Sequence, residues 1–355
     1  MAERIYLDWN ATAPLRVEAR DAMLAAMDVV GNPSSVHAEG RAAKGIVEVA
    51  RAEVAALVGC KPSEVVFTSG ATEAASVLAP MTKTHSVLVD PTAHDAVWAH
   101  NTGLRDGGVV HAFGWANSET GHIDEGPETA SGNRILAEGR TADIVFADVT
   151  QAVGRIPWSF HWSGADLACL SAHKLGGPKG VGALIVRDGR DITALLSGGG
   201  QELGRRSGTE NVAGIAGFGA ACTAAARELA DGTWARVAEL RNILENTLAS
   251  EAKDTIFVGK DVARLPNTSL IVTPGWKGET QVMQMDLAGF AVSSGSACSS
   301  GKVKESRVLK AMGLDDRAAA SALRVSLGPT TTEDHVMAFA QAWLRHEQKF
   351  RQRAA

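Results

Sequence analysis

"LSAHKLGGPKGVGALIV", residues 170–186, places a lysine after one apolar run, and a glycine-rich turn then leads into a second run. The two runs, within 167–173 and 181–187, predict buried β-strands. A lysine at the end of a buried strand is costly to desolvate unless its ammonium group has a specific task. Desolvation lowers the pKa of a lysine, and lysines in such places form Schiff bases. Lys174 is therefore a candidate catalytic residue.

Apolar runs and helix-like stretches alternate through the first two thirds of the chain. The further strands that we expect there lie within 63–70, 85–90 and 143–151. The helices that we expect lie within 37–59, 71–80 and 94–104. This alternation predicts an α/β fold with a mainly parallel sheet.

The last third of the chain predicts a second domain. A long helical stretch, 208–252, leads into it, and a final helix is expected within 332–353. Short strands are expected within 267–275, 289–295 and 322–328. The predicted domains are 16–229, a large α/β domain, and 230–355, a smaller α+β domain to which an N-terminal arm, 1–15, also contributes.

Composition excludes several classes of protein. The chain has 355 residues, which suggests about two domains, and its formal charge of −5 gives no basic surface for nucleic acid. No apolar run reaches the roughly 18 residues of a membrane span, and no secretory signal is visible at the start. We therefore expect a cytoplasmic protein that binds neither nucleic acid nor membranes.

The cysteines do not have the spacing of a metal site. No pair shows C-x-x-C spacing, so neither a zinc site nor a disulfide framework is expected, and the predicted metal is none. Cys60, Cys169 and Cys222 lie in apolar or alanine-rich contexts and are interpreted as core residues. Cys298 differs, because it lies in "VSSGSACSSG", a serine- and glycine-rich run typical of a loop.

Two further strand ends carry polar groups. "SEVVFTSGATEAA", residues 63–75, predicts a strand, a small-residue turn and a helix start, where a phosphate could approach Gly70 and Ala71 and meet the Thr72 hydroxyl. The alternative is an ordinary helix cap at Ser69 or Thr72. Asp148 ends an apolar strand, where its carboxylate could pair with a protonated ring nitrogen or simply cap a helix after the strand.

These features together match the needs of pyridoxal phosphate. That cofactor requires a lysine for a Schiff base, a carboxylate for its pyridine nitrogen and an anion site for its phosphate. Lys174, Asp148 and the turn at Gly70 supply the three in one chain.

The chain resembles the cysteine desulfurases of the NifS/IscS type, which are fold-type I pyridoxal-phosphate enzymes of aminotransferase class V. The motifs that carry the resemblance are "YLDWNATAPL", "GNPSSVHAEG", "VVFTSGATEA", "ANSETG", "DVTQAVG", "SAHKLGGPKGVGAL", "GGGQELGRRSGTENV", "SSGSACSSG" and "LRVSLGPTTTEDHV", in this order. The resemblance implies a large domain with a mainly parallel sheet of seven strands between helices, and a smaller α+β C-terminal domain.

The resemblance also implies a role for each matching residue in cofactor binding. Lys174 forms the Schiff base, His94 stacks on the pyridine ring and serves in proton transfer, and Asp148 pairs with the ring nitrogen. Gln151 and Ser118 contact the phenolic oxygen side of the ring. The residues implied for the phosphate are Ala71, Thr72, Ser171 and His173. Thr209 reaches the phosphate of a partner subunit's cofactor, which implies a homodimer.

Substrate binding and sulfur transfer are implied for other positions. Arg324 binds the carboxylate of L-cysteine, and Asn117 also contacts the substrate. Cys298 is the nucleophile that takes up the substrate's sulfur as a persulfide, and a serine- and glycine-rich loop allows it to travel. Nearby Lys302 and Lys304 favour the thiolate. A sulfur-acceptor protein, such as an iron–sulfur scaffold, is the expected partner.

The sequence departs from the family pattern at two places. "ANSETG" has Ser118 where the family has a second asparagine, and a serine offers a shorter hydrogen-bonding side chain. The segment before Asn117 is short, so that "GVVHAFGW", residues 108–115, stands for what are two strands in relatives.

Three functions remain open from the sequence. The first is conversion of L-cysteine to L-alanine with transfer of sulfur to Cys298. The second is a lyase that acts on selenocysteine or another C–S bond and does not need that thiol. The third is a paralogue that binds the cofactor without turnover.

Overall fold

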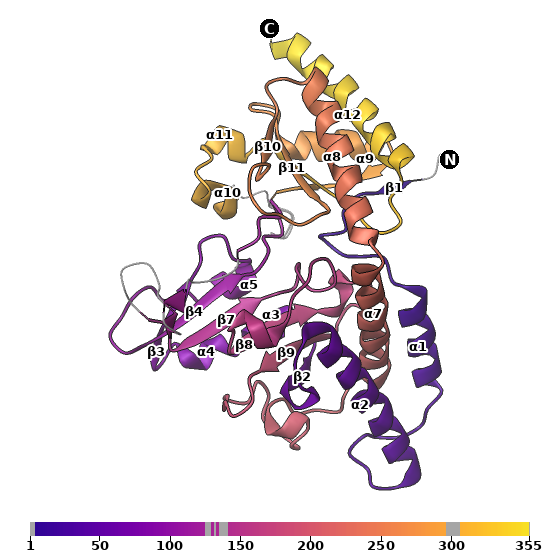
Figure 1. The fold of residues 1–355 in the computed structure, drawn as a ribbon, viewed down its shortest axis with the longest axis vertical. Helices are drawn as coiled ribbons and strands as arrows, with labels where there is room; N and C mark the ends of the chain where they lie inside the picture. The colour runs from indigo at the N-terminus through magenta and orange to yellow at the C-terminus, as the bar shows by residue number, and fades with distance from the viewer. Residues whose placement is uncertain (1–3, 125–128, 131–132, 135–140, 296–305, 355) are drawn as a thin grey trace. The chain divides into compact units, whose positions relative to one another are not determined.

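The computed structural model describes residues 4–124, 129–130, 133–134, 141–295 and 306–354. The chain divides into two compact units (Figure 1). The large unit comprises Pro14–Ala116 and Asp124–Leu229, and the small unit comprises Met1–Ala13, Asn117–Ile123 and Ala230–Ala355. The domain boundaries expected from the sequence did not assign Asn117–Ile123 to the small unit.

A six-stranded sheet forms the centre of the large unit, in the order β2-β9-β8-β7-β4-β3 (Figure 1). Its strands are β2 (Val65–Thr68), β3 (His85–Val89), β4 (Gly108–Gly114), β7 (Ile144–Asp148), β8 (Leu167–Ser171) and β9 (Gly182–Val186). β3, β4, β7 and β8 are parallel to their neighbours in this group, whereas β9 is antiparallel to both β2 and β8. The expected α/β fold with a mainly parallel sheet is confirmed.

The expected seventh strand is absent from the described part of this sheet, so that expectation was wrong. Between β3 and β4 the chain has only residues 90–107, with the single-turn helix α5 (Asp95–Trp98). A parallel crossover to one more strand and back needs more residues than this. β3 is therefore an edge strand.

The free edge of β3 is covered by the loop that follows α5. The Thr102 amide donates to the Val87 carbonyl at 2.9 Å, and its hydroxyl accepts from the Val87 amide at 2.9 Å. The Asn101 side chain accepts from the Val89 amide at 3.2 Å. These bonds satisfy backbone groups that an exposed edge would offer to other chains.

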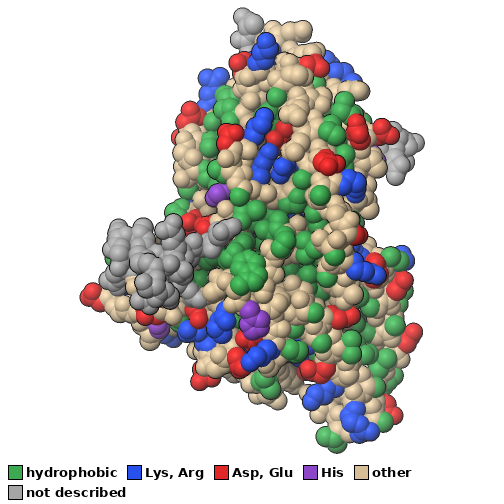
Figure 2. Space-filling model, viewed as in Figure 1, with side chains coloured by type: hydrophobic (Ala, Val, Ile, Leu, Met, Phe, Trp, Pro, Cys, Tyr) green, Lys and Arg blue, Asp and Glu red, His purple; other side chains and the backbone are tan. Residues whose placement is uncertain are grey.

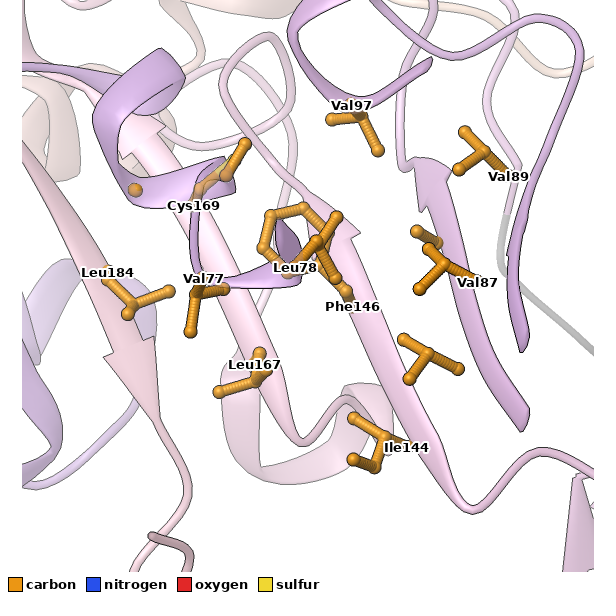
Figure 3. Packing of buried hydrophobic residues seen from close by; sticks show 14 of the residues in the cluster. Val77, Leu78, Val87, Val89, Val97, Ile144, Phe146, Leu167, Cys169 and Leu184 are labelled. Atoms are coloured by element: carbon orange, nitrogen blue, oxygen red, sulfur yellow. The ribbon is translucent and has the colours of Figure 1, made fainter. Parts of the chain in front are cut away.

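One face of the sheet packs against short helices. Val77, Leu78 and Val97 from α3 (Ala71–Ala75), α4 (Leu78–Met81), α5 and their connections meet Phe146 and Leu167 from the strands (Figure 3). All five side chains are essentially inaccessible to solvent. Every residue of β8 and β9 is buried, as expected for strands covered on both faces.

Two longer helices supply buried side chains that cover the opposite face of this sheet. They are α2 (Ala38–Val58) and α7 (Val212–Ala230), and α1 (Val17–Met27) belongs to the same unit. Phe218 of α7 lies edge-on to Phe67 of β2, with ring centroids 6.3 Å apart. Helix α7 approaches α2 at Gly219, where a Cβ would lie 2.7 Å from the Ala50 Cα. The absence of a side chain allows this close contact.

The small unit contains an antiparallel sheet in the order β10-β11-β14-β13. Its strands are β10 (Ile256–Val258), β11 (Thr268–Val272), β13 (Ser293–Ser294) and β14 (Ala322–Ser326). The N-terminal arm joins this unit through β1 (Ile5–Tyr6), which pairs with β12 (Phe290–Ala291). The helices of the unit are α8 (Thr233–Glu251), α9 (Gly278–Leu287), α10 (Arg307–Ala311), α11 (Asp316–Ala319) and α12 (Glu333–Ala354).

The long helical stretch expected at 208–252 is two helices. Helix α7 ends at Ala230 and α8 begins at Thr233, because Gly232 between them adopts a left-handed conformation with φ 83°. No helix among the described residues is long and apolar enough to cross a membrane. On the face shown in Figure 2, acidic and basic side chains are interspersed.

One of the three cysteines that the sequence analysis interpreted as core residues is less buried than expected. Cys169 and Cys222 are completely buried, as expected. Cys60 is only partly buried at the end of α2 and is not a core residue. Burial, and then the nearby Glu64 carboxylate, still raise the pKa of the Cys60 thiol to about 12, so it carries little thiolate at neutral pH.

Candidate active site

Most candidate residues of the large unit follow the carboxyl ends of strands at one edge of the sheet. Ala71 and Thr72 follow β2, His94 follows β3, and Asp148 ends β7. The remaining ones, at or after the ends of β7 and β8, are Gln151, Ser171, His173 and Lys174. Because β2, β3, β7 and β8 all run in the same direction across the sheet, these ends meet at one edge. We call these eight residues the strand-end cluster.

The turn after β2 lies directly against the end of β8. Thr68 and Ser171 both pair with Gly182 of β9, so the three form a row across the sheet. A Cβ on Gly182 would lie 2.6 Å from the Gly70 Cα, and a Cβ on Gly70 would lie 3.6 Å from the Ser171 Oγ. The absence of a side chain at Gly182 therefore allows the turn to pack against the sheet, where Gly70 lies beside the Ser171 hydroxyl.

Lys174 lies in the single turn of 3₁₀-helix (Ala172–Lys174) that follows β8, and it is half-buried. Its backbone carbonyl accepts a hydrogen bond from Arg155 Nη2 at 3.0 Å. Nη1 of the same guanidinium donates to the Gln151 side chain. Arg155 is 4% exposed, so this buried cation fixes the backbone of Lys174 and the side chain of Gln151 together.

His173 is neutral at physiological pH. Burial, followed by the charges of Lys174, Lys179 and Arg155, lowers the pKa of His173 to about 4. A neutral imidazole can still donate one N–H to an anion such as a phosphate.

Asp148 is held at the end of β7 by its own turn. Its Oδ1 accepts from the Thr150 amide at 3.0 Å. It lies opposite Cys169 of β8, and burial, with this carboxylate beside it, raises the pKa of the Cys169 thiol well above its ordinary value. His94 caps α5, with its Nδ1 accepting from the Ala96 amide at 3.1 Å.

Thr209 lies apart in an exposed loop of the large unit. No described residue makes a hydrogen bond with its side chain. Earlier in this loop, Glu202 and Leu203 have φ values of 51° and 57°, which is uncommon for residues other than glycine. Arg51 holds Glu202 by two bonds of 2.8 and 2.7 Å, whereas Leu203 is 80% exposed.

The same loop is tied to the turn after β2. Arg206 donates to Glu73 of α3 at 2.9 Å, and the Ser69 amide donates to the same carboxylate at 2.7 Å. Burial opposes the charge on Glu73, but these hydrogen bonds outweigh it and lower the pKa of the carboxyl.

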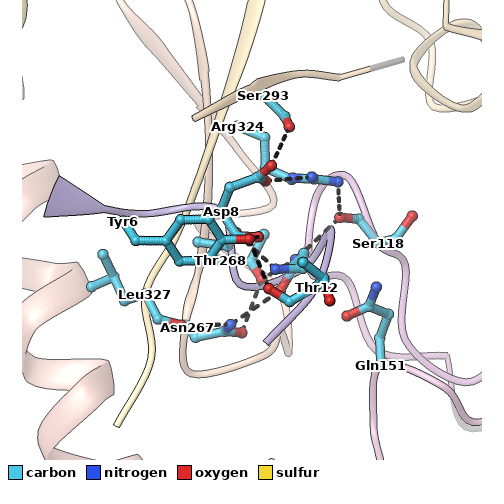
Figure 4. Close-up of polar contacts among 12 residues, drawn as sticks. Tyr6, Asp8, Thr12, Ser118, Gln151, Asn267, Thr268, Ser293, Arg324 and Leu327 are labelled. Carbon is cyan, nitrogen blue, oxygen red and sulfur yellow. Dashed lines mark hydrogen bonds and ion pairs between the residues drawn. The ribbon is translucent and has the colours of Figure 1, made fainter. Parts of the chain in front are cut away.

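Arg324 is the centre of a second polar cluster, in the small unit (Figure 4). It lies on β14 and is 4% exposed. Its Nη2 donates to Asp8 at 2.8 Å, and its Nη1 donates to the Ser118 carbonyl at 3.1 Å. The Ser293 hydroxyl also donates to the Asp8 carboxylate, at 2.7 Å. The buried Nε of Arg324 has no hydrogen-bond partner among the described residues.

Ser118 takes part in this cluster through its backbone. Its carbonyl also accepts from Asn10 Nδ2 at 3.1 Å, whereas its hydroxyl points away from these contacts (Figure 4). The Asn117 Oδ1 accepts from the amides of Glu119 and Thr120, both at 2.9 Å, and so shapes the turn. We call Asp8, Asn10, Asn117, Ser118, Ser293 and Arg324 the arginine cluster.

The sequence interpretation missed Asp8 and Arg155, each of which holds a candidate residue. A signal existed for Arg155, because it is a charged residue within the apolar stretch "QAVGRIPW". Asp8 gave no such signal, since its partner lies 316 positions away. Cys298, Lys302 and Lys304 lie outside the described residues.

Comparison with known proteins places this chain in a family. The profile of the aminotransferase class-V family matches residues 5–111 and 97–339. A cysteine desulfurase of Frankia sp. (strain EuIK1) is 42% identical, with 94% of this chain and 88% of that protein covered. The cysteine desulfurase IscS of Dictyoglomus turgidum is 35% identical, with 94% and 92% covered.

A solved structure agrees with these relatives. The NifS-like protein of Rickettsia africae ESF-5 superimposes with a TM-score of 0.86 at 30% identity, covering 97% of this chain and 99% of that one. The chain therefore belongs to the aminotransferase class-V family.

Proposed function

We propose that this protein is a pyridoxal-phosphate-dependent cysteine desulfurase, which converts L-cysteine to L-alanine and takes up the sulfur as a persulfide on Cys298. Enzymes of the family use pyridoxal phosphate, and curated relatives at 35–42% identity are cysteine desulfurases. The observation that carries the proposal is the strand-end cluster, in which Lys174, Asp148 and the Gly70 turn follow strands that end at one edge.

The strand-end cluster fits the cofactor group by group. The Gly70 turn has the open backbone and the adjacent Ser171 hydroxyl that a phosphate needs, and neutral His173 adds an N–H donor. Asp148 supplies the carboxylate for the pyridine nitrogen, and Gln151 supplies an amide for the phenolic oxygen. His94 would lie over the ring and would hold a proton for transfer.

The bound cofactor would supply an electron sink that weakens the C–S bond of the substrate. Lys174 would hold the cofactor covalently at its Nζ. Arg324 would bind the carboxylate of L-cysteine through its buried guanidinium, a cation that carboxylates pair with strongly. Asp8, which accepts from Nη2 of Arg324 at 2.8 Å, orients that guanidinium.

Cys298 then removes the sulfur. Its thiolate attacks the sulfur of L-cysteine, a new S–S bond forms, and the C–S bond breaks as the carbon takes up a proton. The products are L-alanine and a persulfide on Cys298, so atoms and electrons balance without an external oxidant. An acceptor protein, such as an iron–sulfur scaffold, receives the sulfur afterwards. The proposal places the reaction in the cytoplasm, where free thiols stay reduced.

The proposal includes a homodimer in which Thr209 reaches the partner's cofactor phosphate. Its support is that Thr209 is exposed, and that the same loop holds a strained Leu203 with an 80% exposed side chain. Strained backbone persists where surrounding structure over-determines it, often at functional sites. Sedimentation at micromolar concentration tests this, and a stable monomer with full activity would contradict it.

Cys298→Ala tests the whole proposal. The variant should bind cofactor and L-cysteine, because those steps need Lys174 and Arg324, but alanine formation should fall by several orders of magnitude. Mass spectrometry should find 32 Da added to the wild-type peptide that holds Cys298, about the mass of one sulfur atom. Cys60→Ala is the matched control and should keep wild-type activity. Alanine formation by Cys298→Ala at the wild-type rate would instead favour a lyase that needs no protein thiol.

A further inference from the structure

Glu119 joins the two described ends of segment 296–305. One carboxylate oxygen, Oε2, accepts a hydrogen bond from the Ser306 hydroxyl at 2.7 Å. A Cβ on Gly295 would lie 2.9 Å from the same oxygen. Gly295 is the residue before the segment and Ser306 is the residue after it, so both ends meet at one atom of Glu119.

Each end is also anchored in the small unit. Ser306 is buried and caps α10, where its Oγ accepts from the Leu309 amide at 3.2 Å. Gly295 follows β13, whose Ser293 pairs directly with Arg324 of β14. A side chain at Gly295 would displace the Glu119 carboxylate, because 2.9 Å is too close for a real Cβ contact.

The backbone beside Glu119 holds Arg324. The backbone carbonyl of Ser118, the preceding residue, accepts a hydrogen bond from Arg324 Nη1 at 3.1 Å. The turn that carries both residues is fixed, since Asn117 Oδ1 binds the Glu119 amide and the Gly121 carbonyl accepts from the Leu265 amide at 2.8 Å. One peptide link therefore separates the contact to Arg324 from the contact to Gly295 and Ser306.

We propose that Glu119 is a positioning residue for sulfur transfer, which sets the ends of the Cys298 segment relative to the Arg324 guanidinium. This inference rests on the proposed function, in which Arg324 holds the substrate carboxylate and Cys298 attacks its sulfur. Cys298 is three positions after Gly295, and three positions of chain span at most about 10 Å. A small shift at Gly295 would therefore move the thiol relative to the substrate, and misplacement by about 1 Å can cost ~100-fold in rate.

Glu119→Ala tests the inference, because its effect on the placement of the Cys298 thiol can be measured separately from its effect on the reactivity of that thiol. We expect kcat for alanine formation to fall at least about tenfold, with the KM for L-cysteine within about threefold and the cofactor absorption retained. Alkylation of Cys298 by iodoacetamide should stay within about threefold of wild type, because a dissolved reagent needs no placement. A purely structural role would lower cofactor content and thermal stability instead.

Three further variants complete the experiment. Glu119→Gln keeps an oxygen that accepts from Ser306, so its kcat should fall by no more than about threefold. Ser306→Ala removes the same bond from the other side and should lower kcat by more than Glu119→Gln does; these two carry the test if Glu119→Ala fails to fold. Glu279→Gln, at an exposed position of α9, is the control and should match wild type.

Specific outcomes would overturn the inference. The first is a kcat of Glu119→Ala within twofold of the wild-type value. The second is a loss of Cys298 alkylation in Glu119→Ala that parallels its loss of turnover. The third is a kcat of Glu119→Gln as low as that of Glu119→Ala. Absence of alanine formation by the wild-type protein would be a different result, because it would overturn the proposed function and this inference with it.

Discussion

The strand-end cluster and the arginine cluster are assembled in different ways. In the first, each residue ends or follows the strand that places it, and the shared direction of these strands brings their ends to one edge. In the second, Asp8, Ser118 and Ser293 come from three distant segments and meet around Arg324, with partners separated by 206 to 316 positions. Topology therefore determines the first cluster, whereas tertiary hydrogen bonds determine the second.

This difference predicts how each cluster responds to substitution. A strand end depends on a sheet buried on both faces, so removing one polar side chain should change chemistry more than folding. The arginine cluster contains a buried ion pair, so removing one partner should change folding as well. Substitutions at Lys174, Asp8, His173 and Ser118 test this difference.

Lys174→Ala should abolish turnover while the large unit stays folded. Loss of the covalent anchor of the cofactor should lower alanine formation by at least about 10⁴-fold. Borohydride reduction of the wild-type holoenzyme, followed by peptide mapping, should locate the adduct on Lys174. Lys179→Ala, five positions on at an exposed site, is the matched control and should keep the adduct and the activity. An adduct on any other lysine would contradict the assignment.

Asp8→Ala should destabilise the protein. Arg324 is 4% exposed, and an unpaired buried charge typically costs about 3–5 kcal/mol in the free energy of unfolding. Ser293→Ala is the control, because it removes only the hydroxyl bond to the same carboxylate and should cost less, about 2 kcal/mol. Denaturant unfolding of both variants measures the difference. Equal losses would mean that the ion pair is no more important than the hydrogen bond from Ser293.

The same contrast explains how much of the molecule was predictable. Alternating strands and helices predicted the sheet, and the strand-end residues follow from that alternation, since parallel strands bring their ends together. The number of strands in the sheet was not predicted, because it depends on whether residues 90–107 suffice for another crossover. The Asp8–Arg324 pair was not predictable, because nothing local to either residue indicates a partner 316 positions away.

His173 should make stability depend on pH. Its folded-state pKa of about 4 lies below the ordinary value of 6.5, mainly because of burial. As pH falls from 6.5 to 4, the unfolded chain binds a proton there that the folded chain does not, so the free energy of unfolding falls; above 6.5 the contribution is complete. His173→Gln cannot titrate and should lose less stability between about pH 7 and about pH 4.5.

Urea unfolding of the cofactor-free proteins at the two pH values measures this effect. His161→Gln, at an exposed position, is the control and should keep the wild-type pH dependence. If His173→Gln follows the wild-type curve, the histidine is not held neutral in the folded chain.

Ser118→Ala should have the smallest effect and tests whether this residue acts through its backbone. The carbonyl, which the substitution keeps, accepts from Arg324 and Asn10, both at 3.1 Å, while the hydroxyl points away from them (Figure 4). The KM for L-cysteine and the affinity for pyridoxal phosphate should therefore each change by less than about threefold. Titration of the apoprotein with the cofactor, and steady-state kinetics, measure the two. A loss of cofactor affinity beyond about tenfold would mean that the hydroxyl binds the cofactor directly, and Ser118 would then belong with the strand-end cluster in function although its backbone belongs to the arginine cluster.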